Sequence, residues 1–168
     1  LGIDMGTYET KGVLVDIKGK SIAQSFKRHE LIVPKKGWAE HRPLEDWWND
    51  FVYICQDLIK ISNCNPKSIK AVTASAIGPC MLPVSYEGDP LMNAVLYGVD
   101  TRAENESREL NEEVGEAKIL QNCGNALTSQ SVGPKILWLK KNCPEIFKKA
   151  GKILSSTSFL VQKLTGES

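Results

Sequence analysis

The first 33 residues alternate short apolar runs with turns that contain glycine. This pattern predicts three β-strands, at Leu1–Met5, Gly12–Ile17 and Ser21–Val33. The connections contain Gly6-Thr7 and Lys18-Gly19, and connections of this length join antiparallel neighbours. The chain should therefore begin with two successive hairpins that form one side of a β-sheet.

A helical periodicity follows a loop at Pro34–Arg42. Apolar residues recur at steps of three and four, whereas charged and amide residues fall between them. The apolar positions are Leu44, Trp47, Trp48, Phe51, Cys55 and Leu58. Pro43 suits the first turn of a helix, and the carboxylates of Glu45 and Asp46 complement its positive end. We expect an amphipathic helix that covers one face of the sheet.

The middle of the chain again predicts strands. Ile69–Ile77 is a run of small and β-branched residues without alternating charge, which is typical of a strand buried on both faces in the middle of a sheet. Cys80–Tyr86 and Leu91–Tyr97 flank the turn Glu87-Gly88-Asp89-Pro90 and should pair like a hairpin.

From Asp100 onward, helical patterns dominate. They predict helices at Arg102–Val114, Glu116–Gln121, Pro134–Lys141, Pro144–Ala150 and Ser158–Leu164. Gly166 should cap the last helix, and Lys152–Ser155 should add one short strand. Strands first, then a crossover and then helices indicate a mixed α/β domain with the hairpins on one side of its sheet.

The composition is that of an ordinary globular chain of 168 residues, 42% hydrophobic and 24% charged. Its net charge of +1 gives no support to binding of nucleic acid or of an anionic membrane surface. No apolar run approaches the roughly 18 to 20 residues of a membrane span, so we expect a cytoplasmic protein. Five widely spaced cysteines favour neither a zinc site nor a disulfide framework. The start inside a strand, without Met, favours a segment of a larger protein.

The opening Gly2-Ile3-Asp4-Met5-Gly6-Thr7-Tyr8-Glu9-Thr10-Lys11 places a carboxylate at the end of a strand, before a Gly-Thr turn. Gly6 allows a close backbone approach, so the amides and hydroxyls of this turn could bind phosphate oxygens. Asp4 would repel phosphate unless Mg²⁺ or its waters lay between them. The pattern indicates metal-nucleotide binding, and an ordinary hairpin turn is the alternative.

Other catalytic patterns are absent from the sequence. No G-K-[ST] ending marks a P-loop, no G-x-G-x-x-G follows the first strand, and Ser75 and Ser85 lack the frame of a hydrolase nucleophile. His29 falls at a strand edge, and we interpret His41 as a solvated loop residue rather than a general base.

A second polar cluster ends the strand at Leu96-Tyr97-Gly98-Val99-Asp100-Thr101-Arg102. Ligands of α/β sheets bind at the carboxyl ends of strands, where Asp100 and Arg102 could bond the hydroxyls of a polyol. Asp100 could instead cap the following helix. Trp38, in a loop, could stack on a sugar or cover the sheet.

Four motifs, in order along the chain, resemble the FGGY family of carbohydrate kinases, in the actin and sugar-kinase superfamily. They resemble its first phosphate motif, its G-W-x-E-x-x-P…W signature, its A-I-L-W/Y…D-x-R segment and its K-x-x-W-L…P-E…L-T-G-E stretch. The matching residues are Gly2–Thr7 with Thr10 and Lys11, Gly37–Pro43 with Trp47 and Trp48, Ala94–Tyr97 with Asp100–Arg102, and Lys135–Leu139 with Pro144, Glu145 and Leu164–Glu167. Four spaced motifs are more specific than any one of them.

The resemblance implies a ribonuclease H-like α/β domain with a mixed sheet flanked by helices, residues 1–168 being most of the N-terminal, sugar-binding domain. It implies ATP-dependent phosphorylation of a sugar hydroxyl, with ATP and Mg²⁺ as cofactors. Asp4 would organise Mg²⁺ through water. The groups that would border the transferring phosphate are Gly6, Thr7, Thr10 and Lys11. The general base and the ATP-binding domain would lie beyond residue 168, so this segment alone should be inactive.

The segment that contacts the sugar departs from the family pattern. Xylulose-specific members typically carry G-Q-x-H-G after the central strand, where this chain has Ala76-Ile77-Gly78-Pro79-Cys80. Similar G-P-C-M-L stretches occur in xylulose-kinase-like members, so we expect a pentulose such as xylulose as the acceptor. The expected contacts are Gly78, Pro79, Cys80, Asp100 and Arg102. The alternative is a non-catalytic nucleotide-binding or sugar-binding module of the same superfamily. The expected partners are small molecules, without nucleic acid or membrane, and the oligomeric state stays open, a homodimer included.

Overall fold

The structure is a computed structural model that describes residues 1–167. Ser168, the last residue of the expected domain, lies outside the described residues. The chain divides into two compact units. The first comprises Leu1–Leu31, His41–Ile77 and Ser156–Ser168, and the second comprises Ile32–Glu40 and Gly78–Ser155. Within residues 1–167, no helix combines the length and the apolar character needed to cross a membrane.

The first unit is built around a four-stranded sheet in the order β3-β2-β1-β5. Its strands are β1 (Gly2–Met5), β2 (Glu9–Val15), β3 (Ser21–Arg28) and β5 (Thr73–Ala76). β2 pairs antiparallel with both β1 and β3, whereas β5 runs parallel to β1. The antiparallel start predicted from the hairpins is confirmed, and the sheet is mixed.

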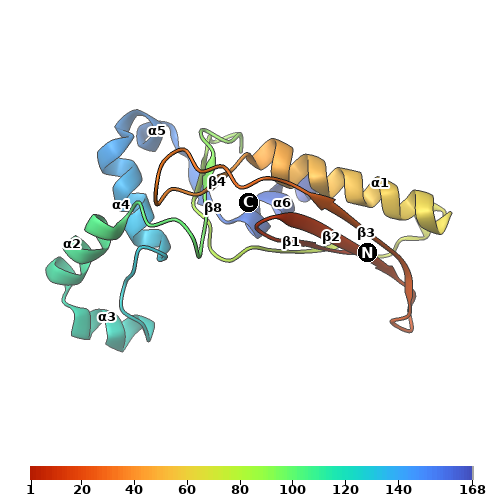
Figure 1. The fold of residues 1–168 in the computed structure, drawn as a ribbon, viewed down its shortest axis with the longest axis horizontal. Coiled ribbons are helices and arrows are strands. Elements are labelled where there is room, and N and C mark those ends of the chain that lie inside the picture. The colour runs from red at the N-terminus through yellow and green to blue at the C-terminus, as the bar shows by residue number, and fades with distance from the viewer. Residues whose placement is uncertain (168) are drawn as a thin grey trace. The chain divides into compact units, whose positions relative to one another are not determined.

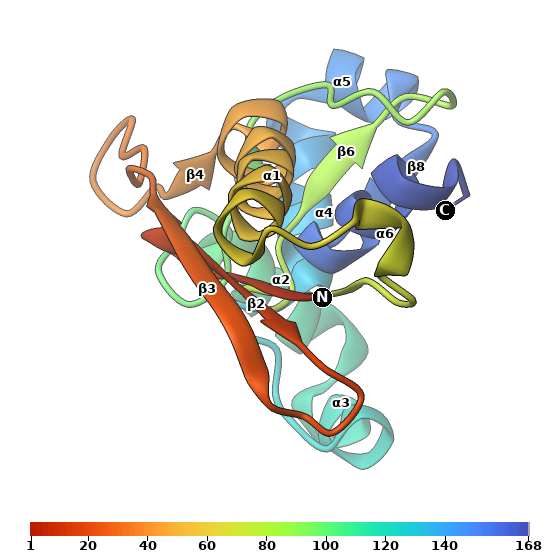
Figure 2. The ribbon, with the colours of Figure 1, turned by 90° about the vertical axis from the view of Figure 1, so that its right-hand side faces the viewer.

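One long helix, α1 (Asp50–Ser62), covers one face of this sheet, as Figure 1 and Figure 2 show. The π-helical segment η1 (Pro43–Asn49) leads into it, so the predicted amphipathic helix is confirmed. Helix and strand approach closely at Gly12 of β2, where a Cβ would lie 2.2 Å from Cγ2 of Ile54. Glycine at this position therefore allows the helix to pack directly on the backbone of the sheet.

The strand β5 differs from its prediction. It lies at the edge of the sheet in the part of the chain that the structure describes, and its residues are exposed or half-buried. The prediction of a central strand buried on both faces is therefore wrong for the described residues.

Two shorter elements complete the first unit. The 3₁₀ turn η2 (Pro66–Ser68) precedes β5, and the helix α6 (Ser156–Thr165) packs against β5 and η1. Gly166 has a φ of +78° and donates its amide to the carbonyl of Gln162, so the predicted glycine cap is confirmed.

The second unit contains short strands and a group of helices. β6 (Leu82–Val84) pairs with β8 (Lys152–Leu154), and β4 (Glu40–His41), whose Glu40 belongs to this unit, pairs with β7 (Ala94–Val95). The helices are α2 (Glu104–Val114), α3 (Glu116–Cys123), α4 (Val132–Asn142) and α5 (Pro144–Lys149). They confirm the helical region predicted after Asp100. A buried cluster forms the core, consisting of Met81, Val95, Ala103, Trp138 and Leu139.

The predicted hairpin around Glu87–Pro90 is present only as isolated bridges. Met81 bridges Val95, and Val84 bridges Pro90. The regular ladder of β6 is instead made with β8, a strand far along the chain. Local alternation predicts a strand well, but it does not select the partner.

Candidate functional site

The β1–β2 hairpin forms the first candidate site, and its turn is tight at Gly6. Asp4 pairs with Lys11 across the two strands. The amide of Gly6 donates to the carbonyl of Glu9 at 2.9 Å, and a Cβ on residue 6 would lie 3.2 Å from that same oxygen. A side chain here would crowd the carbonyl, so the turn favours glycine as the sequence predicts.

Strand alternation separates the residues expected to border phosphate. Asp4 and Lys11 are exposed on the open side of the sheet, whereas Thr10 is fully buried on the side that α1 covers. The Thr10 hydroxyl has no hydrogen-bond partner among the described residues. Lys11 pairs with Glu9 at 2.9 Å, and this hydrogen bond raises the pKa of Lys11. The hairpin thus brings Asp4 and Lys11 together but turns the Thr10 side chain away from them.

An open groove of about 840 Å³ runs along the uncovered side of this sheet. Asp4, Lys11, Arg28 and Ser75 are among the residues that line it. The groove combines carboxylate and cationic side chains, so solvent and small ions have direct access to the carboxylate of Asp4.

The exposed carboxylate of Asp4 fits the Mg²⁺ role that the resemblance implies. Mg²⁺ prefers oxygen ligands and retains several waters, so a single accessible carboxylate can hold the hydrated ion. Within residues 1–167, no group of three or more His, Cys, Asp or Glu side chains is arranged to hold a metal. The remaining ligands would then be water and phosphate oxygens.

Both histidines contact this turn, which the sequence does not reveal. The Nε2 atom of His41 lies 2.9 Å from the carbonyl oxygen of Thr7, and that of His29 lies 3.2 Å from the carbonyl oxygen of Gly6. His41 is fully buried, so its interpretation as a solvated loop residue is wrong. No local pattern predicts these contacts, because they join residues 34 and 23 positions apart.

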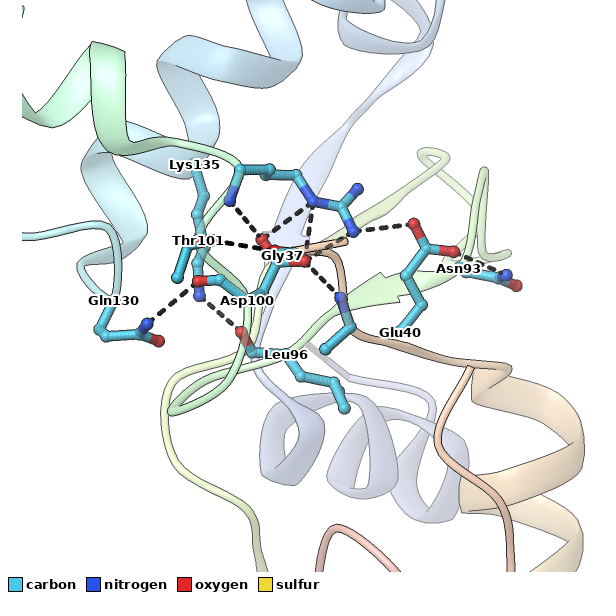
Figure 3. Close-up of polar contacts among 10 residues, drawn as sticks. Gly37, Glu40, Asn93, Leu96, Asp100, Thr101, Gln130 and Lys135 are labelled. Carbon is cyan, nitrogen blue, oxygen red and sulfur yellow. Dashed lines mark hydrogen bonds and ion pairs between the residues drawn. The ribbon is translucent and has the colours of Figure 1, made fainter. Parts of the chain in front are cut away.

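The second candidate site is the loop Leu96–Arg102 in the second unit, where buried charges meet (Figure 3). Arg102 donates from Nε to Oδ2 of Asp100 at 2.9 Å and from Nη2 to Oε1 of Glu40 at 2.8 Å. Asp100 also accepts the backbone amide of Ala39 at 2.7 Å. The side chains of Asp100 and Arg102 have no exposed surface, so this network ties the loop to the segment that carries Glu40.

The guanidinium of Arg102 contacts two indole rings. Its carbon is 3.8 Å from the ring centroid of Trp38 and 5.0 Å from that of Trp138. The two rings meet edge to face, with centroids 5.2 Å apart. A planar cation is attracted by the negative faces of aromatic rings, so Trp38 covers a buried arginine.

Two more side chains hold the backbone of the loop. Lys135 donates to the carbonyl of Leu96 at 2.6 Å. Gln130 accepts the amide of Gly98 at 2.6 Å and donates to the carbonyl of Asp100 at 3.0 Å, as Figure 3 shows for Asp100. Lys135 is fully buried, and burial lowers its pKa while the charge of Asp100 opposes that change. Lys135 and Gln130 were not singled out as site residues from the sequence.

The loop places Tyr97 beside Gly78. A Cβ on residue 78 would lie 2.9 Å from Cδ1 of Tyr97, so glycine allows this close approach. Gly78 and Pro79 are exposed, whereas Cys80 is buried.

The alternative role of Asp100 as a helix cap is wrong, because the residue that precedes the first turn of α2 is Ala103.

The fold of this chain is similar to that of solved sugar kinases. Xylulose kinase from Rhodospirillum rubrum superposes with a TM-score of 0.91 at 26% identity, over 99% of this chain and 34% of that chain. Plasmodium falciparum glycerol kinase, solved with ADP, superposes with a TM-score of 0.89 at 25% identity, over 100% of this chain and 36% of that chain. The chain therefore has the actin and sugar-kinase fold that the sequence predicted.

Residues 1–168 match the FGGY family of carbohydrate kinases, N-terminal domain, and the chain belongs to this family. It is 32% identical to xylulose kinase of Bacillus subtilis over 166 residues, which are 99% of this chain and 33% of that protein. It is also 32% identical to glycerol kinase of Corynebacterium efficiens, in an alignment of 169 residues that covers 98% of this chain and 33% of that protein. The chain thus spans about a third of the length of these relatives.

Proposed function

We propose that the protein containing this chain is an ATP-dependent carbohydrate kinase, which transfers the γ-phosphoryl group of ATP to a hydroxyl of a sugar. The observation that carries this proposal is the family match over residues 1–168. It is supported by the tight Gly6 turn beside an exposed Asp4, because phosphoryl transfer depends on positioning and on neutralising charge over the phosphate oxygens.

Several residues of the hairpin have distinct roles in this proposal. Asp4 holds Mg²⁺ through water, and the bound ion would neutralise charge on the phosphate oxygens. The turn binds the phosphate through backbone amides that follow Gly6, because the Gly6 amide itself donates to the carbonyl of Glu9. Lys11 reaches the phosphate when it leaves its ion pair with Glu9. The backbone of Thr10 borders the site, since its hydroxyl faces the covered side.

For the acceptor we propose a pentulose such as xylulose, with glycerol as the second candidate. Relatives of both kinds have the same 32% identity, so this choice rests on the G-P-C-M-L stretch that begins at Gly78. Gly78, Pro79 and Cys80 line the acceptor site together with Tyr97. Asp100 and Arg102 act by holding the Tyr97 loop, because both side chains are fully buried.

We further propose that the protein works in the cytoplasm on ATP and a sugar, without binding nucleic acid or a membrane. In this proposal the general base and the adenine site belong to a part of the protein outside these 168 residues, which span about a third of the length of the relatives. Residues 1–168 alone should bind ligands without turnover.

The test is ADP release by the full-length protein with ATP and Mg²⁺, across a panel of ketoses, aldoses and polyols. We expect one acceptor to stimulate release, and Asp4→Ala to abolish that stimulation. Asp89→Ala, which removes an exposed carboxylate from a turn of the second unit, is the matched control and should leave the rate unchanged. ATP binding without stimulation by any acceptor would favour a non-catalytic nucleotide-binding module, and sugar binding without ATP dependence would favour a sugar-binding one.

A further inference from the structure

Three consecutive carbonyl groups of the Gly6-Thr7-Tyr8 turn are held by two histidine residues. The oxygen of Gly6 lies 3.2 Å from Nε2 of His29, and the oxygen of Thr7 lies 2.9 Å from Nε2 of His41. The oxygen of Tyr8 accepts the backbone amide of His29 at 3.0 Å. The carbonyls of this turn therefore all have donors within the first unit.

This arrangement also fixes where the amides of the turn point. A trans peptide is planar, so its N–H group points opposite to its C=O group. The amides of Thr7 and Tyr8 therefore point away from the donors that hold the carbonyls of Gly6 and Thr7. Among the described residues, neither of these two amides donates a hydrogen bond, whereas the Gly6 amide donates to the carbonyl of Glu9. Two neighbouring free N–H groups can bind an anion.

The ring of His41 is held in one neutral form. Its Nδ1 atom accepts the indole N–H of Trp47 at 3.0 Å, so the ring proton lies on Nε2 and is donated to Thr7. Burial, together with the nearby His29, lowers the pKa of His41 to about 4. Trp47 is fully buried and packs edge-on against Phe159, which fixes the partner of the ring.

The ring of His29 has a different environment. Its Nδ1 atom lies 2.9 Å from Oδ2 of Asp50, and its Nε2 atom faces the Gly6 carbonyl. Both partners are acceptors, so both bonds form only when both ring nitrogens carry protons. Asp50 also pairs with Lys27 at 2.7 Å, and its side chain and that of His29 are each 3% exposed. The two rings meet edge to face, with their centroids 4.8 Å apart.

We propose that His29 and His41 are positioning residues for the phosphate turn: their rings hold the carbonyls of Gly6 and Thr7 and thereby aim the amides of Thr7 and Tyr8 at a phosphate group of the nucleotide. This inference rests on the proposed role of the turn in ATP binding. Neither ring touches the phosphate itself.

Amide side chains distinguish the two nitrogen positions of each ring. In place of histidine, the amide of glutamine reaches the position of Nε2, whereas the shorter asparagine reaches only that of Nδ1. His41→Gln therefore keeps a donor for Thr7, and His41→Asn removes it. His29→Gln and His29→Asn make the same distinction for Gly6. Ser25→Ala is the matched control, because it removes a partly buried hydrogen bond between β3 and α1, to Asp57.

The measurement is calorimetric titration of the full-length protein with MgATP. We expect His41→Asn to weaken binding roughly tenfold, about the worth of one hydrogen bond, while His41→Gln stays within about twofold of the original protein. His29→Asn and His29→Gln should differ in the same direction, and Ser25→Ala should bind normally. Equal losses in the Asn and Gln variants, or an equal loss in Ser25→Ala, would overturn the positioning role.

The ring states are tested separately by ¹⁵N NMR with labelled histidine, each signal being assigned through its variant. We expect the Nε2 atom of each ring to carry a proton. A proton on Nδ1 of His41, or no proton on Nε2 of His29, would overturn the proposed contacts. Failure of the original protein to bind MgATP would overturn the proposed function and this inference together. If the original protein binds MgATP and phosphorylates a sugar, but the His29 and His41 variants bind MgATP equally well, this inference alone would be overturned.

Discussion

The buried guanidinium of Arg102 gives the sharpest stability prediction, because it pairs with two carboxylates that have little or no contact with water. Arg102→Ala would leave Asp100 and Glu40 without this partner, the first with a fully buried side chain and the second 9% exposed. Removing one member of a buried ion pair costs about 3–5 kcal/mol, since the remaining charge is left uncompensated. The flanking indole rings would also lose a cation, worth about 0.5–2 kcal/mol. These terms overlap, so we expect the free energy of unfolding to fall by about 3–5 kcal/mol.

The assay is urea unfolding followed by circular dichroism, with the dependence on urea concentration compared between variants. Arg102→Lys keeps the charge but loses the planar fork, so its loss should lie between that of alanine and zero. Lys148→Ala is the control. Its ion pair with Glu145 has side chains 70% and 76% exposed, and exposed pairs contribute only about 0–1 kcal/mol. A loss in Arg102→Ala no larger than in Lys148→Ala would refute the argument that buried charges hold the Leu96–Arg102 loop.

Three further changes test other parts of the structure. Gly12→Ala drives a Cβ into α1 and should destabilise the protein by about 1–3 kcal/mol in thermal unfolding. Gly2→Ala is the control, because its Cβ would meet neighbours at 3.7 Å, and it should cost less than about 1 kcal/mol. His41 has a folded-state pKa of about 4 against an ordinary value of 6.5, so the unfolded chain binds the proton first as the pH falls. The contribution of neutral His41 to the free energy of unfolding is complete above about pH 6.5 and falls by up to about 3 kcal/mol as the pH approaches 4. His41→Gln should therefore flatten this part of the profile when urea unfolding is measured against pH. Gly78→Ala places a Cβ 2.9 Å from the Tyr97 ring. In steady-state kinetics we expect the KM for the sugar to rise roughly tenfold while the KM for ATP stays unchanged. An unchanged KM for the sugar would show that Tyr97 does not belong to the acceptor site.

Elements with a strong local pattern were predictable from the sequence. The hairpins of β1 to β3 follow from apolar runs and turn residues, and α1 follows from apolar positions at helical spacing. The position of β5 did not follow, because a run of small residues has the same composition at the edge of a sheet as in its middle. The partner of β6 did not follow either, since β8 is distant in the sequence.

The candidate site was predictable to the same extent. The Asp4 and Gly6 positions follow from a local motif. The side chain of Thr10 points to the opposite face of the sheet from those of Asp4 and Lys11. Strand alternation predicts this only when β2 is known to start at Glu9. His29, His41 and Lys135 act through contacts with distant backbone carbonyls, and any carbonyl can accept such a bond. These contacts therefore cannot be read from residue type or spacing, even for Lys135, which lies in the K-x-x-W-L motif.

The central claim is that the protein containing this chain moves a phosphoryl group from ATP to a sugar hydroxyl. The most direct measurement is ³¹P NMR of the full-length protein with ATP and Mg²⁺, with xylulose in one sample and glycerol in another. We predict a phosphate ester of one acceptor that accumulates in step with ADP and is absent from Asp4→Ala. ADP with inorganic phosphate alone, or ATP left intact with every acceptor tried, would contradict the claim.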